Sequence, residues 1–282
     1  MRKDLLLPGL SLVGGVAGFA LRRWQLASAF HPETGLFTHG APATYALLAL
    51  VGLLILAVFL SVRGIREGPD DFLPAFICPQ SGQMAVLVAS ALLFLAAGVL
   101  GISDGLVQLS LFRTDPEAYP LTYPVALLLG AVLCLPGGCA VLFLGRATYR
   151  GELNDTACWL APFPAAAGLI RLFITHLEHG TEPVLLRYCF PLAAAAFLML
   201  GLYYAAGFLY GRSRRRCALF FSLSGVILGI TALADGLSLA AAALTMAYVL
   251  AALALSRALL YNCAGLPWPG PVPPDPDAPT EG

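Results

Sequence analysis

Residues 45–62 read YALLALVGLLILAVFLSV, eighteen positions without a charge or a proline. A helix that crosses the hydrocarbon core of a bilayer needs about 20 mostly apolar residues. A helix on the surface of a soluble protein would carry a charged face, and this stretch has none. It therefore predicts a membrane-spanning helix.

The rest of the chain has the same character. Of its 282 residues, 59% are hydrophobic and 11% are charged, whereas soluble domains carry about 25% charged residues. Cutting the chain at its charged and Pro/Gly-rich breaks predicts an all-α integral membrane protein with about eight transmembrane helices. The predicted spans are residues 5–21, 45–62, 84–102, 123–144, 158–175, 188–210, 218–233 and 239–260. Only Ala234-Asp235-Gly236 separates the last two, and without that break the count would be seven.

The cations predict how the chain is oriented, because cytoplasmic loops of membrane proteins are enriched in Lys and Arg. With the N-terminus in the cytoplasm, eleven of the sixteen cations fall on the cytoplasmic side, four fall outside and one lies within the fifth span. Eight spans then place both termini in the cytoplasm. A cleaved signal peptide is the alternative for the first span, but Arg22, Arg23 and Trp24 interrupt the apolar run before the small-residue site at 27–29.

Short motifs recur in the two halves of the chain. AGFALR at 17–22 corresponds to AGLIR at 167–171, and DGL occurs at both 104–106 and 235–237. Each arginine is followed by a His and an acid, His31 with Glu33 and His176 with Glu178. We therefore expect two parallel four-helix repeats, residues 1–150 and 151–262, although apolar helices also align by chance. Residues 263–282 are rich in proline and predict a disordered cytoplasmic tail.

Ionisable groups near the membrane core are costly, so they are the first candidates for function. The candidate ligand-binding residues, all near the predicted outer ends of their spans, are Arg22, Arg23, Arg171, Asp104 and Asp235. Two arginines, one from each half, would hold a carboxylate or phosphate in an outward-facing cavity. The alternative is that they reach the lipid headgroups or pair with the two aspartates between helices.

Other features point to packing rather than to chemistry. GxxxG spacings at 14–18 and 225–229 predict close helix contacts, and Pro136-Gly137-Gly138 predicts either a break or a packed kink in the fourth span. His176 and His179 would share a helical face, but they match no metal-binding motif and the seven cysteines show no CxxC spacing. We expect no metal and no cofactor.

Residues 18–36, GFALRRWQLASAF followed by HPETGL, resemble the start of uncharacterised bacterial multipass membrane proteins. The resemblance covers the first loop and its flanking spans. It implies a bacterial cell membrane as the location and brings no activity.

The function that these features favour is a permease-like protein for a small anionic solute or lipid. The alternative is a non-transporting membrane subunit or scaffold that contacts a protein partner through its helices or tail. An enzyme is less favoured, because no Walker A, GxSxG or dinucleotide motif occurs and no nucleophile and base stand at a recognisable spacing. Nucleic-acid binding is not expected at zero net charge.

Overall fold

The computed structural model describes residues 3–30, 36–38, 40–65, 67–117, 120–180 and 184–265. Within these ranges the chain is helical apart from its connections and one isolated antiparallel bridge between Phe30 and Phe37. Eight segments are long and apolar enough to cross a membrane, which confirms the predicted all-α membrane fold. The helices are α1 (Lys3–Ser28), α2 (Pro42–Arg63), α3 (Phe72–Phe76), α4 (Ser81–Thr114), α5 (Thr122–Arg150), α6 (Asp155–Leu160), α7 (Pro162–Glu178), η1 (Leu185–Arg187), α8 (Cys189–Gly207), η2 (Phe208–Tyr210), α9 (Arg215–Ala232), η3 (Leu233–Asp235) and α10 (Leu239–Cys263).

The last two spans are separate helices. The chain leaves α9 through η3 and turns at Gly236, whose φ of +69° lies in the left-handed region that glycine adopts without a steric penalty. The Ser238 hydroxyl then accepts a hydrogen bond from the amide of Ala241 and caps α10. The count of eight is therefore correct.

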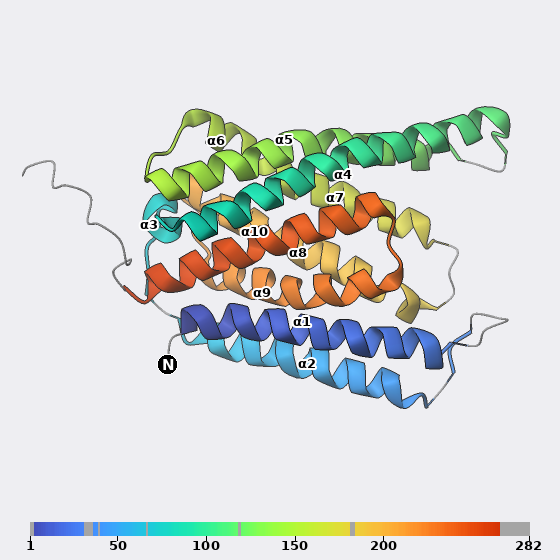
Figure 1. The fold of residues 1–282 in the computed structure, drawn as a ribbon, viewed down its shortest axis with the longest axis horizontal. Coiled ribbons are helices and arrows are strands. Elements are labelled where there is room, and N and C mark those ends of the chain that lie inside the picture. The colour runs from blue at the N-terminus through green and yellow to red at the C-terminus, as the bar shows by residue number, and fades with distance from the viewer. Residues whose placement is uncertain are drawn as a thin grey trace, which may run out of the picture.

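Several helices extend beyond the predicted spans. α1 continues to Ser28, so that Arg22 and Arg23 lie on the helix rather than after it. α4 has 34 residues, about 51 Å at 1.5 Å per residue, and its end projects past the other helices (Figure 1). Dividing the sequence at charged residues underestimates the length of such helices, because an arginine or aspartate ends the apolar run without ending the helix.

α9 lies in the middle of the bundle and is its most buried span. α1 and α2 pack on one side of it, while α8 and α10 pack on others. α4 and α5 pack on each other and on α10 and α7, on the far side of the molecule from α1 and α2 (Figure 1). In the described residues, helices of the second half thus separate the pair α1 and α2 from the pair α4 and α5. The two-repeat arrangement stays a prediction.

Small residues set the closest helix contacts. A side chain at Gly225 would come within 3.0 Å of the backbone nitrogen of Leu198, so α9 and α8 can approach this closely only with glycine there. At Gly201 a side chain would meet the backbone of Ser222, also at 3.0 Å. α5 remains helical through Pro136, and a side chain at Gly138 would lie 2.9 Å from the carbonyl oxygen of Ala91. The Pro-Gly-Gly segment is therefore part of a packed helix and does not break it.

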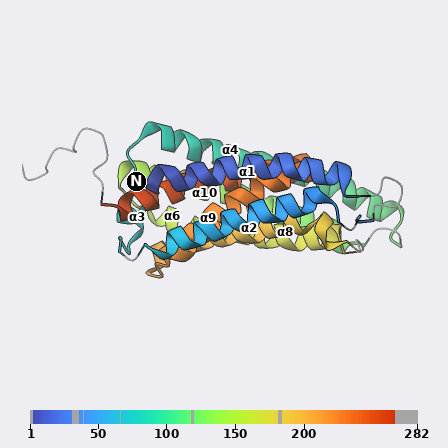
Figure 2. The ribbon, with the colours of Figure 1, turned by 90° about the horizontal axis from the view of Figure 1, so that it is seen from below.

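α1 begins and α10 ends at the same end of the bundle, as the two perpendicular views show (Figure 1 and Figure 2). We call this the arginine-rich end, because the turn between α8 and α9 brings Arg212, Arg214, Arg215 and Arg216 to it. The short helix α3 also lies at this end, where Phe76 packs edge-on against Phe208 at 5.1 Å between ring centroids. The opposite end carries the end of α1, η1 and η3.

Candidate functional site

Among the cations whose burial the structure describes, Arg22 is the most deeply buried, with a side chain that is 0% exposed. Its Nε donates a hydrogen bond to Oδ1 of Asp235 at 2.6 Å. One terminal nitrogen donates to Oε1 of Gln25 at 2.6 Å and to the carbonyl of Leu186 at 3.0 Å, and the other donates to the carbonyl of Arg187 at 2.8 Å. Arg22 thus connects α1 to η3 and η1 at the opposite end.

The ring of Phe190 covers the Arg22 guanidinium, whose carbon lies 4.9 Å from the ring centroid. Gln25 continues the network by donating to the hydroxyl of Thr44 on α2 at 3.0 Å. Asp235 is 6% exposed, and its second carboxylate oxygen accepts no hydrogen bond in the described part of the chain. The cluster is therefore a closed polar contact between helices, of the kind expected when a buried charge has a partner.

Arg171 has a different environment, although the sequence placed it in the motif that corresponds to Arg22. Its terminal nitrogens lie 3.5 and 3.4 Å from the two carboxylate oxygens of Glu178, about two turns further along α7. The hydroxyl of Tyr123 on α5 donates to the same carboxylate at 3.1 Å. The Arg171 and Glu178 side chains are 13% and 21% exposed, so water reaches this ion pair.

The two remaining candidates, Arg23 and Asp104, are exposed. The structure therefore brings together two of the five sequence-predicted residues, Arg22 and Asp235. In the described part of the chain, the other three form no hydrogen bond or ion pair with these two. Arg171 lines a cavity of about 20 Å³ with residues that include Tyr248 and Leu237, and Arg22 does not line it. Ligand binding at the five residues stays a prediction.

The histidines do not gather into a site in the described ranges. His31, Glu33 and His39 lie outside them, as does most of the proline-rich tail. His176 is exposed, whereas His179 stacks on Tyr188 with 5.1 Å between ring centroids and has Nδ1 3.0 Å from the carbonyl of Thr175. No group of three or more His, Cys, Asp or Glu residues in the described ranges is arranged to hold a metal ion.

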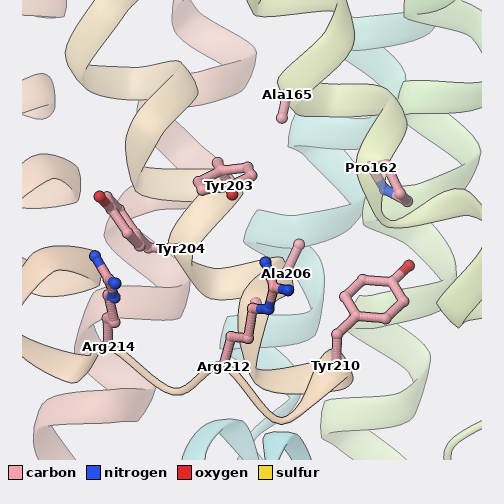
Figure 3. Close-up of a pocket in the computed structure, with 9 residues that line it drawn as sticks. Pro162, Ala165, Tyr203, Tyr204, Ala206, Tyr210, Arg212 and Arg214 are labelled. Carbon is pink, nitrogen blue, oxygen red and sulfur yellow. The ribbon is translucent and has the colours of Figure 1, made fainter.

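A cavity lies at the arginine-rich end, between the start of α7 and the end of α8 (Figure 3). Its volume is about 650 Å³, within the range of about 300–1,000 Å³ that is usual for small-molecule sites. Its walls are mainly apolar and aromatic, and two arginines stand at its mouth. The lining residues are Pro162, Ala165, Tyr203, Tyr204, Ala206, Gly207, Tyr210, Arg212 and Arg214.

The sequence feature that marks this cavity is the basic turn at 212–216, because clustered arginines beside a membrane span are typical of contact with anionic lipid. The first two arginines of this turn differ from the last two in their contacts. Arg215 donates to the carbonyl of Gly68 and lies 3.5 Å from a carboxylate oxygen of Asp70. Arg212 and Arg214 form no side-chain hydrogen bond or ion pair with another described residue.

No protein-family model, curated protein or solved structure matches the sequence. The function must therefore be argued from the two ends of the bundle: a buried ion pair at one end and an open cavity with two arginines at the other.

Proposed function

We propose that the protein is a permease-like membrane protein that moves an anionic small molecule or lipid. The observation that carries this proposal is the difference between the two ends. At the arginine-rich end, a cavity of about 650 Å³ offers two guanidinium groups that have no acidic partner among the described residues. A cavity with apolar walls and a few convergent polar groups is typical of a ligand site.

In this proposal the Arg22–Asp235 pair keeps the opposite end closed. The pair joins α1 to the turn between α9 and α10, and two carbonyls of η1 accept further hydrogen bonds from Arg22. An anion that reaches this end would replace the Asp235 carboxylate on Arg22, because Asp235 accepts from Arg22 through one oxygen only, whereas a phosphate or carboxylate can accept through two. Arg23, Arg171 and Asp104 would then contact the anion at that end once the pair has opened.

Reconstitution into liposomes tests transport directly. We would measure translocation of a fluorescent phosphatidylglycerol between leaflets, and uptake of radiolabelled phosphate, in proteoliposomes and in protein-free liposomes. The proposal expects protein-dependent movement of at least one probe. It also expects Ala165→Phe to slow that movement, because the added ring would fill part of the cavity that Ala165 lines.

Leu169→Phe is the matched control, because Leu169 lies one turn further along the same helix, is 56% exposed and does not line the cavity. Equal rates with and without protein for both probes would overturn the proposal. Equal slowing by the two phenylalanine variants would show that the cavity is not the route.

A non-transporting subunit is the second candidate, and the projecting end of α4 favours it. Leu106 and Val107 are 55% and 56% exposed on that projection. A groove of about 320 Å³ between α5 and α7 is also apolar, with lining residues that include Val125 and Phe173. A stoichiometric protein partner after purification in mild detergent, lost on Leu106→Gln, would support this candidate, and a stable protein without a partner would argue against it.

A further inference from the structure

We infer that the cavity at the arginine-rich end is a binding site for an anionic phospholipid, whose phosphate lies between Arg212 and Arg214 and whose first acyl segment lies along α7 and α8. This inference names the ligand of the proposed permease, and it rests on that proposed function for the role that the bound lipid would have. The binding step itself can be measured without transport.

The turn that carries the two arginines is held in place by its other members. The Ser213 hydroxyl donates to a carboxylate oxygen of Asp70 at 2.6 Å, and Arg215 pairs with the same carboxylate at 3.5 Å. Arg216 donates from Nε to the carbonyl of Ile65 at 2.9 Å. Contacts to the connection between α2 and α3 therefore fix the backbone of the turn, while the Arg212 and Arg214 guanidinium groups stay available for a ligand.

The backbone also directs Arg212 towards the cavity. Its amide donates to the carbonyl of Gly207 at 2.9 Å, which folds the chain back over the end of α8. In the close-up view the Arg212 side chain reaches towards Ala206 and the Arg214 side chain towards Tyr204 (Figure 3). Two guanidinium groups at one mouth match a phosphodiester, because each can donate two parallel hydrogen bonds to its oxygens.

Polarity changes with depth in the way that a phospholipid requires. Tyr203 lies four residues before Gly207, the last residue of α8, and is therefore about 6 Å deeper along the helix axis. Ala165 lies three residues after Pro162, the first residue of α7, or about 4.5 Å deeper. Cations thus stand at the level of the helix ends and apolar walls lie below them, which is the order of phosphate and acyl chain across a membrane interface.

Three tyrosines line the cavity, from Tyr210 beyond the end of α8 to Tyr203 at the deeper level. Tyr210 donates its hydroxyl to the carbonyl of Cys158 at 2.6 Å, so its ring is fixed beside α6. Tyr204 stacks on Phe221 of α9, with 5.6 Å between ring centroids, and Tyr203 is 53% exposed. Amphipathic rings at this depth are typical of membrane interfaces. A small soluble anion would leave these aromatic and apolar walls uncovered, and for this reason we assign a lipid.

The test is a binding titration with the purified full-length protein in a non-ionic detergent. The probes are short-chain phosphatidylglycerol and short-chain phosphatidylcholine, with inorganic phosphate as a competitor. We expect phosphatidylglycerol to bind at least about tenfold more tightly than phosphatidylcholine, whose own cation opposes the two arginines. We expect Arg212→Gln and Arg214→Gln each to raise the Kd for phosphatidylglycerol about tenfold, as for loss of one charged hydrogen-bonded contact.

Arg150→Gln is the matched control, because Arg150 is exposed at the same end of the bundle and does not line the cavity. It should change the Kd by less than about twofold if a shaped site, and not the general positive potential, holds the lipid. Circular dichroism spectra that match the parent protein would show that each variant is folded.

Three results would overturn the inference: equal weakening by Arg150→Gln and Arg212→Gln, equal affinity for the two lipids, or full competition by millimolar phosphate, which would indicate a site for a soluble anion. Lipid binding without movement of either probe in proteoliposomes would overturn the permease proposal alone. Transport of phosphate without phosphatidylglycerol binding would overturn the lipid inference alone.

Discussion

Replacing Arg22 by methionine should destabilise the protein far more than the same replacement at Arg171. Methionine keeps an unbranched side chain that helices tolerate, so the two variants differ from the parent mainly in the lost guanidinium. Arg22 is 0% exposed and its partner Asp235 is 6% exposed. Its removal leaves a buried carboxylate without its cation, and breaking one side of such a pair costs about 3–5 kcal/mol.

Arg171 and Glu178 are 13% and 21% exposed, and their closest nitrogen and oxygen atoms are 3.4 Å apart. Water can therefore replace the lost partner. A pair of this kind contributes about 1 kcal/mol or less to the free energy of unfolding. The expected difference between Arg22→Met and Arg171→Met is thus at least about 2 kcal/mol, which follows from the figures for a buried and a solvated pair.

The double variant Arg22→Met with Asp235→Leu separates the ion pair from the packing around it. It removes both charges, so no uncompensated carboxylate remains, and it should recover at least half of the free energy lost in Arg22→Met. Equilibrium unfolding in mixed dodecyl maltoside and dodecyl sulfate micelles, followed by far-ultraviolet circular dichroism, measures all three values. The reasoning is refuted if Arg22→Met costs no more than Arg171→Met, or if the double variant is less stable than Arg22→Met.

Three further predictions concern packing, reactivity and orientation. Gly201→Ala should lower the free energy of unfolding by about 1–3 kcal/mol, because the methyl group would collide with the backbone of α9. Gly52→Ala is the control: its methyl group meets no atom within 4 Å, so it should not lower the free energy of unfolding. Burial raises the pKa of the Cys78 thiol. In a variant that keeps only this cysteine, maleimide labelling of the folded protein should therefore reach its half-maximal rate at a higher pH than labelling of the denatured protein. Coincident pH profiles would contradict this prediction. The cation distribution predicts that the cysteine in Glu152→Cys reacts with a membrane-impermeant thiol reagent only after the cells are opened. The cysteine in Glu117→Cys, at the opposite end of the bundle, should react in intact cells. The reverse pattern would show that the orientation is inverted.

The number of spans could be predicted from the sequence because hydrophobic length is a local property. A run such as 45–62 can satisfy its backbone in a bilayer only as a helix, and Gly236 marks the turn that keeps the last two spans apart. The ends of the helices could not be predicted as well. Charged residues at 22, 23, 104 and 113 lie on α1 and α4, because projecting or partnered helical turns can carry charge.

At the candidate site, sequence motifs do not predict the environment of the charged side chains. Arg22 and Arg171 occur in similar motifs, as do Asp104 and Asp235. In the structure, Asp235 is buried against Arg22, while Asp104 is exposed on the projecting end of α4. One sequence motif therefore corresponds to two environments, because the neighbouring helices, and not the motif, decide how much water reaches the side chain.

By itself, the sequence determined that the chain is a helical membrane protein with eight spans and a strongly asymmetric distribution of cations. These properties follow from apolar length and from charge, which each segment carries independently of its neighbours. Only the tertiary structure decided that Arg22 is held by Asp235, and that Arg212 and Arg214 face a cavity while Arg215 and Arg216 hold the turn in place. Those roles depend on residues more than 100 positions apart coming within hydrogen-bonding distance, which only the packing of the helices brings about.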